Sequence, residues 1–161
     1  MTNKPSLFAA IGAALLLTPA ALSAAPLGED ARACTSGGPA ILVRVSGLKN
    51  RVGRVRVRAF TGNPSTYFTK GREVGWIEVP IPAVGPVEIC VAARPGVYAV
   101  DVRHDANLNR KTDFSDGAGI SGNPGLSVLD VVLRRRPPAQ QVQFRVGNGV
   151  AVVPVQVRYK G

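Results

Sequence analysis

The chain has 161 residues, and its 20 basic and 10 acidic side chains give a formal net charge of +10. This length fits one domain with a hydrophobic core, since domains of about 100 to 150 residues are the commonest. A single histidine excludes a multi-histidine zinc site, and the two cysteines form no CxxC redox motif.

Residues 1–24 have the pattern of a secretory signal peptide. Lys4 precedes an apolar run from Leu7 to Leu17, and the small residues up to Ala24 suit signal peptidase, so we place cleavage after Ala24, with the next residue the close alternative. An N-terminal membrane anchor is the other interpretation. No later apolar run is long enough for a membrane helix, so we expect no transmembrane segment after signal removal. Residues 25–161 are then one domain of a periplasmic or secreted protein.

Cys34 and Cys90 both lie after the predicted cleavage site. An exported protein meets an oxidising compartment, and an even cysteine count with none left over usually means pairing. We therefore expect a disulfide between Cys34 and Cys90; the alternative is that both remain reduced.

Short apolar stretches separated by Gly and Pro predict strands, and no segment has a convincing helical period. Seven such strands, alternating apolar and polar residues, indicate an all-β, antiparallel β-sandwich, with a small closed barrel as the alternative architecture. The predicted strands are Ala40 to Ser46, Arg54 to Phe60, Val74 to Val79, Val87 to Ala92, Val97 to Arg103, Gln141 to Val146 and Val150 to Tyr159.

Two features modify this pattern. Leu126 to Leu133 is apolar enough to form an eighth strand inside the long connection that follows His104. Pro154 cannot donate a hydrogen bond to a neighbouring strand, so it predicts an edge strand or a bulge in the last strand.

The loop after the fifth strand concentrates oxygen-bearing side chains. Asp105, Asn107, Asn109, Asp113 and Asp116 occupy positions one, three, five, nine and twelve of a calcium-binding loop. Lys111, at position seven, would contribute its backbone carbonyl.

Two residues of this loop depart from the calcium pattern. Arg110 stands at the sixth position, where glycine makes the sharp turn, and Asp116 replaces a longer glutamate at the twelfth. Two interpretations therefore stay open: a weak calcium site, or a metal-free loop in which Asp and Asn bond to nearby backbone N–H groups.

This region also resembles a known family. The secreted bacterial proteins of the domain of unknown function 2141 family have a central signature that is similar to Gly96-Val97-Tyr98-Ala99, His104-Asp105, Asn107, Asn109, Lys111, Asp113, the Gly119 region and Ser127. The resemblance implies export and a transthyretin-like or immunoglobulin-like β-sandwich, and it implies no particular activity. The family usually has glycine where this chain has Arg110, and a glutamate-containing run where this chain has GISGNPGLSV.

Arg54, Arg56 and Arg58 fall at alternate positions of one predicted strand, so all three project from one face while the intervening residues face the core. Such a face would attract anionic envelope components through contacts that salt weakens; the alternative is a merely solvated surface. The interleaved aromatic residues of a nucleic-acid platform are missing, so no specific nucleic-acid partner is expected.

Two function classes follow from these observations. We favour a non-enzymatic binding or structural module of the cell envelope, with calcium as its one candidate cofactor and no catalytic residue assigned. The alternative is an envelope enzyme that uses the Asp-rich loop and His104, although a solitary histidine beside Asp105 is most simply a structural hydrogen-bonding residue.

Overall fold

The computed structural model describes residues 24–113, 115–125 and 136–160. The predicted signal peptide, apart from Ala24, and the candidate strand Leu126 to Leu133 lie outside the described residues. The elements are α1 (Ala31–Thr35), β1 (Ala40–Ser46), β2 (Arg54–Thr61), β3 (Glu73–Pro80), β4 (Val87–Ala92), β5 (Gly96–Asp105), β6 (Gly117–Ile120), α3 (Ala139–Val142), β7 (Phe144–Val146), β8 (Val150–Gln156) and β9 (Arg158–Tyr159). Among these residues, no helix is long and apolar enough to cross a membrane.

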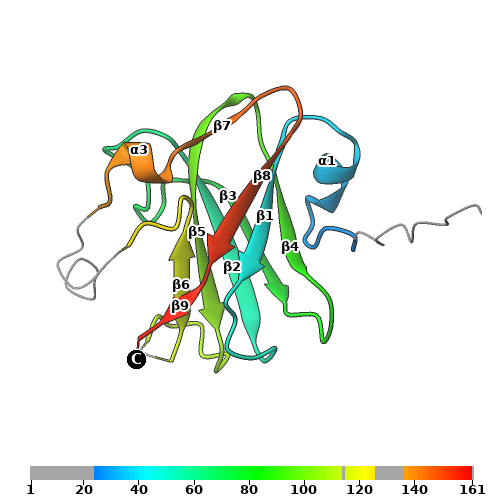
Figure 1. The fold of residues 1–161 in the computed structure, drawn as a ribbon, viewed down its shortest axis with the longest axis vertical. Helices are drawn as coiled ribbons and strands as arrows, with labels where there is room; N and C mark the ends of the chain where they lie inside the picture. The colour runs from blue at the N-terminus through cyan, green and yellow to red at the C-terminus, as the bar shows by residue number, and fades with distance from the viewer. Residues whose placement is uncertain (1–23, 114, 126–135, 161) are drawn as a thin grey trace, which may run out of the picture.

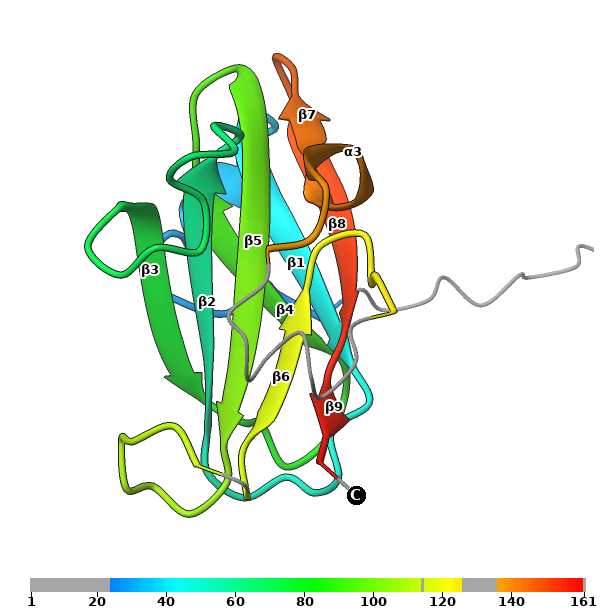
Figure 2. The same cartoon turned by 90° about the vertical axis from the view of Figure 1, so that its left-hand side faces the viewer.

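Two sheets pack face to face, which confirms the predicted β-sandwich (Figure 1). One sheet has the order β4-β1-β8, and the other has the order β3-β2-β5-β6-β9, with β7 also paired to β5. The pairings in the described residues are antiparallel except β1 with β8, which run parallel. Figure 2 shows the larger sheet as neighbouring strands β3, β2, β5 and β6.

The core lies between the sheets because the strands alternate as the sequence predicts. In β2, Val55, Val57 and Ala59 are at most 1% exposed, while the arginines between them point to the other face. The matching positions of the small sheet supply Ile41, Val43 and Ile89. A disulfide joins Cys34 to Cys90, as expected, and ties α1 to β4 with the Cα atoms 6.0 Å apart.

A second, smaller core lies on the outer face of the larger sheet. Phe60 and Ala99 point outward there and are covered by Tyr67, from the loop after β2, and by Val142 of α3. This packing corrects the predicted strand Gln141 to Val146. Pro138 precedes a single helical turn, closed by the Gln143 N–H on the Ala139 carbonyl at 2.9 Å, and strand geometry begins only at Phe144.

The predicted last strand, Val150 to Tyr159, is divided between the two sheets. β8 forms the edge of the small sheet beside β1, which agrees with the edge position that Pro154 predicts. At Val157 the chain leaves β1, and β9 then pairs with β6 of the larger sheet. Val157 is 2% exposed, so the crossing point is itself part of the core.

Candidate functional site: a basic hollow beside the Asp-rich loop

The outer face of β2 carries the three predicted arginines, and the cross-strand register decides what each one meets. Opposite them on β5 stand Asp105, Arg103 and Asp101, in register with Arg54, Arg56 and Arg58 respectively. The predicted projection from one face is therefore confirmed. The three arginines nevertheless have different electrostatic surroundings.

Arg54 and Arg58 are paired with carboxylates. Arg54 Nε donates to Glu78 Oε1 at 2.8 Å. Arg58 lies between two carboxylates, with Nε 2.9 Å from Asp101 Oδ1 and Nη1 3.0 Å from Glu73 Oε1, and its side chain is only 16% exposed. Burial opposes the charge of Arg58, but the hydrogen bonds and charges of Asp101 and Glu73 dominate and raise its pKa. These two arginines are internally neutralised.

Arg56 has no such partner. Its side chain is half-buried, and its Nε is buried without a hydrogen bond to any residue that the structure describes. Arg103 stands directly opposite on β5, so two like charges face each other across the strands. Burial lowers the pKa of Arg56, and the charges of Arg103 and Arg58 act in the same direction. The charged form of Arg56 would therefore gain from an added anion.

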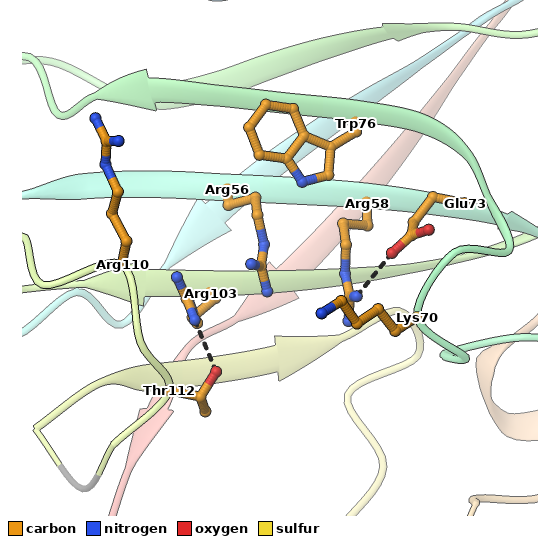
Figure 3. Close-up of a pocket in the computed structure, with 8 residues that line it drawn as sticks. All are labelled: Arg56, Arg58, Lys70, Glu73, Trp76, Arg103, Arg110 and Thr112. Carbon is orange, nitrogen blue, oxygen red and sulfur yellow. Dashed lines mark hydrogen bonds and ion pairs between the residues drawn. The ribbon is translucent and has the colours of Figure 1, made fainter.

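Arg56 lies in a hollow of about 340 Å³ on this face (Figure 3). We call it the Arg56 hollow; its lining consists of Arg56, Arg58, Lys70, Glu73, Trp76, Arg103, Arg110 and Thr112. Strands β2, β3 and β5 form the floor, while the loops after β2 and β5 supply Lys70 and Arg110 at opposite ends of the view. Five of the lining side chains are basic and one is acidic.

The Asp-rich loop satisfies many of its polar groups internally. Asn107 Oδ1 accepts from the Asn109 N–H at 3.1 Å, and Asn109 Oδ1 accepts from the Lys111 N–H at 2.8 Å. Asp113 accepts from the side-chain amides of both asparagines and from the Ser115 N–H and hydroxyl. Hydrogen bonds from Ser115, Asn107 and Asn109 hold the pKa of Asp113 well below its usual range. These are the Asx turns of the metal-free interpretation.

Asp105 and Asp116, at the first and twelfth positions of the loop, are buried and only partly hydrogen-bonded. The side chains of Asp105 and Asp116 are 4% and 3% exposed, and each has an Oδ2 3.9 Å from the Arg103 guanidinium. Asp105 Oδ2 also accepts the Arg110 N–H at 2.9 Å. Within the described chain, Oδ1 of both aspartates is buried without a hydrogen-bond partner. Two buried acceptors are thus left unsatisfied next to one arginine.

The predicted calcium ligands are therefore close in sequence but form two subgroups in space. Asp105 and Asp116 converge on Arg103, whereas Asn107, Asn109 and Asp113 bond to one another on the exposed side. Lys111 is exposed. Within the described residues, no group of three or more His, Cys, Asp or Glu side chains has a metal-binding arrangement. Calcium binding stays a prediction.

His104 lies on the opposite face of β5 from the acidic residues. It is 0% exposed, with Nδ1 2.5 Å from the Tyr159 hydroxyl and Nε2 2.6 Å from the Val52 carbonyl. The Val52 carbonyl can only accept, so Nε2 donates in that hydrogen bond. Since neighbouring residues of a strand point to opposite faces, His104 shares no cleft with Asp101 or Asp105.

Several members of the Arg56 hollow were not predicted as site residues. Trp76 and Arg103 occupy outward positions of predicted strands, and that alternation was the available signal. Lys70 and Thr112 come from loops, whose position over the sheet has no local sequence signature.

Comparison with known proteins gives a family and no activity. No curated protein and no solved structure matches the chain significantly. Residues 43–153 match the family model described as "Uncharacterized protein conserved in bacteria (DUF2141)", and this range contains most of β1, all of β2 to β7, the Asp-rich loop and every residue that lines the hollow. The match covers more than half of the chain, so the protein belongs to the DUF2141 family of bacterial proteins.

Proposed function

We propose that this protein is an exported, non-enzymatic binding module of the bacterial cell envelope, and that the Arg56 hollow binds an anionic group of an envelope component. One observation carries the proposal: Arg56 is a half-buried cation without a carboxylate partner in the described residues, although its neighbours Arg54 and Arg58 each have one. A buried charge without a partner is costly, and an incoming carboxylate, phosphate or sulfate would remove that cost.

Geometry supports an oxyanion in particular. A guanidinium offers parallel N–H groups that match two oxygens of a carboxylate or phosphate, and such charge-assisted bonds are stronger than neutral ones. Three further side chains of the hollow have partners that position them. Asp101 accepts from Arg58, Asp105 lies beside Arg103, and Arg103 donates to Thr112. The floor of the hollow is therefore organised before a ligand binds.

The test is a titration of the protein with sulfate and inorganic phosphate, followed by amide chemical shifts. Arg56→Ser should abolish the shifts in β2 and β5 and weaken binding at least tenfold. Arg94→Ser is the matched control, since Arg94 is an exposed arginine in the loop between β4 and β5, outside the hollow. Equal binding by the wild type and Arg56→Ser would refute the proposal.

A second candidate function, weak calcium binding, is favoured by the unsatisfied Oδ1 atoms of Asp105 and Asp116. Asp105, Asp113 and Asp116 carry three negative charges, Arg103 compensates one, and a divalent cation would balance the remainder. With Arg110 at the turn position, we expect a dissociation constant of about 0.1 to 1 mM.

Calorimetry with calcium tests this candidate. At a calcium concentration one hundred times the dissociation constant, the folded state should gain about 2.7 kcal/mol. Asp105→Ala should remove that gain. If calcium up to roughly ten times the upper expected constant does not raise the melting temperature of the wild type, the loop is a metal-free set of Asx turns.

A further inference from the structure

The Arg56 hollow has more positive charge without an ion-pair partner than one small anion would neutralise. Lys70 and Arg110 line it together with Arg56, and in the described residues neither of their side chains has a carboxylate partner. The only acidic lining residue, Glu73, is already bonded to Arg58. In the described residues, the hollow therefore presents three cations that form no ion pair with a carboxylate.

These cations are spread along the hollow rather than gathered at one point. Figure 3 shows Lys70 at one end, Arg110 at the other, and Arg56 between them. A volume of about 340 Å³ falls at the lower end of the range of about 300 to 1,000 Å³ for small-molecule sites. The spread of the cations fits an extended ligand with several separate negative groups, of which the hollow would hold one segment.

Arg110 is kept in the hollow at a conformational cost. Its φ is +60°, in the left-handed region that favours glycine. The hydrogen bond from its N–H to Asp105 Oδ2 fixes this turn, and the side chain extends across the strands at one end of the hollow (Figure 3). A strained residue that places a cation in a site is a reason to infer a role for that cation.

Trp76 adds an aromatic surface beside these charges. It projects from β3, the edge strand of the larger sheet, and is 52% exposed although it is the only tryptophan of the chain. The negative face of an indole attracts the weakly positive C–H groups on one face of a sugar ring, as it attracts cations. The Thr112 hydroxyl accepts from Arg103 at 2.7 Å and keeps its own proton for a ligand oxygen.

We infer that the Arg56 hollow binds a segment of acidic oligosaccharide, with acid groups at Lys70, Arg56 and Arg110 and one sugar ring against Trp76. This inference rests on the proposed function of the same site. A flat anionic membrane fits less well, because Arg56 lies on the strand floor, between Lys70 and Arg110 on the loops that follow β2 and β5 (Figure 3). A single-stranded nucleic acid would require successive aromatic platforms, and the described residues contribute one aromatic side chain, Trp76, to the hollow lining.

Isothermal titration with matched probes tests the inference. Tetragalacturonate should bind at least tenfold more tightly than galacturonate, and neutral maltotetraose should not bind. Trp76→Ala should weaken tetragalacturonate binding about five- to twentyfold, and by a larger factor than it weakens sulfate binding. Arg94→Ser should change neither affinity.

Arg110→Gly removes the cation while keeping a residue that suits the left-handed backbone, and urea denaturation of the variant checks that its fold is intact. The variant should weaken tetragalacturonate binding at least fivefold, with little effect on galacturonate. The inference is overturned if tetragalacturonate binds no better than galacturonate, or if oligothymidylate or phosphatidylglycerol vesicles bind as tightly and depend equally on Trp76 and Arg110. If the oligosaccharide result fails but sulfate binding still requires Arg56, the proposed function stands. If sulfate binding does not require Arg56 either, the proposed function is rejected as well.

Discussion

The arginines at alternate positions of β2 differ in whether they have a carboxylate partner, because different residues stand opposite them on the neighbouring strands. Arg54, Arg56 and Arg58 share a strand and a face, but only Arg56 stands opposite another arginine. The sequence predicts the shared face from the alternation of β2 alone. It could not predict which arginine lacks a partner, because that depends on the register of β5 and β3, which is set far from β2 along the chain.

Arg103 links the Asp-rich loop to the Arg56 hollow, and its removal should be costly. It is the basic side chain beside the buried Asp105 and Asp116, and taking away one partner leaves uncompensated buried charge. Arg103→Met should lower the free energy of unfolding by about 3 kcal/mol, measured by urea denaturation at neutral pH.

The same variant also tests calcium binding. Without Arg103, the loop carboxylates lose their nearest compensating charge, so calcium should raise the melting temperature of Arg103→Met more than that of the wild type. A melting temperature independent of calcium in both proteins would contradict a calcium site at Asp105 and Asp116.

Asp113 should make stability depend on pH in the acid range. Its pKa in the folded state lies below the ordinary value because Ser115, Asn107 and Asn109 donate to the carboxylate. The resulting stabilisation is complete above the unfolded-state pKa, near 3.9, and is lost as the pH falls toward the folded-state value. Asp113→Asn should therefore be less stable than the wild type at pH 7, and the difference should shrink below about pH 4. A difference that stays constant from pH 7 to pH 3 would show that the carboxylate charge plays no part.

At the turn that contains Arg110, the backbone conformation favours glycine, whereas the arginine side chain adds a cation to the hollow. A residue other than glycine in the left-handed region costs roughly 1 kcal/mol. Arg110→Gly should consequently raise the free energy of unfolding by about 1 kcal/mol, measured by urea denaturation, while removing one cation from the hollow. A destabilised variant would mean that the Arg110 side chain makes a stabilising contact in the folded state.

Strand prediction succeeded where the apolar alternation continued over a whole element. β1 and β4 have the predicted limits, β2 is one residue longer at its end, and β3 and β5 are longer by one or two residues at each end. It failed for Gln141 to Val142, where Val142 packs on the outer face of the larger sheet and the preceding prolines favour a helical turn. The division at Val157 was also missed, because the alternation continues unbroken while the hydrogen-bonding partner changes from β1 to β6.

At the scale of the whole molecule, the Cys34–Cys90 disulfide fastens the N-terminal segment to β4, an edge strand of the small sheet. It joins residues 56 apart in sequence, and closing a loop of this length should stabilise the fold by about 4 kcal/mol in the chain-entropy model. A double Cys34→Ser, Cys90→Ser variant should show that loss in urea denaturation. An unchanged midpoint in the variant would mean that the disulfide adds nothing to stability.

The inner faces of the two sheets form the core, and the outer face of the larger sheet carries the candidate site. The inner faces of both sheets are apolar, and His104 is bonded within them, so neither supplies an accessible site. The outer face of the larger sheet divides into the apolar cluster around Phe60, covered by α3, and the uncovered basic hollow around Arg56. The strongly charged Arg56 hollow on this outer face is where our proposed function lies.

The most direct test of this account is the Nε–H signal of Arg56 in a ¹⁵N correlation spectrum during a sulfate titration. Its Nε is buried and has no hydrogen-bond partner in the described residues, whereas Nε of Arg54 and of Arg58 already donate to carboxylates. The account predicts a saturable shift of the Arg56 signal and little change for Arg54 and Arg58. Equal, non-saturating shifts for all three arginines would contradict an anion site at Arg56.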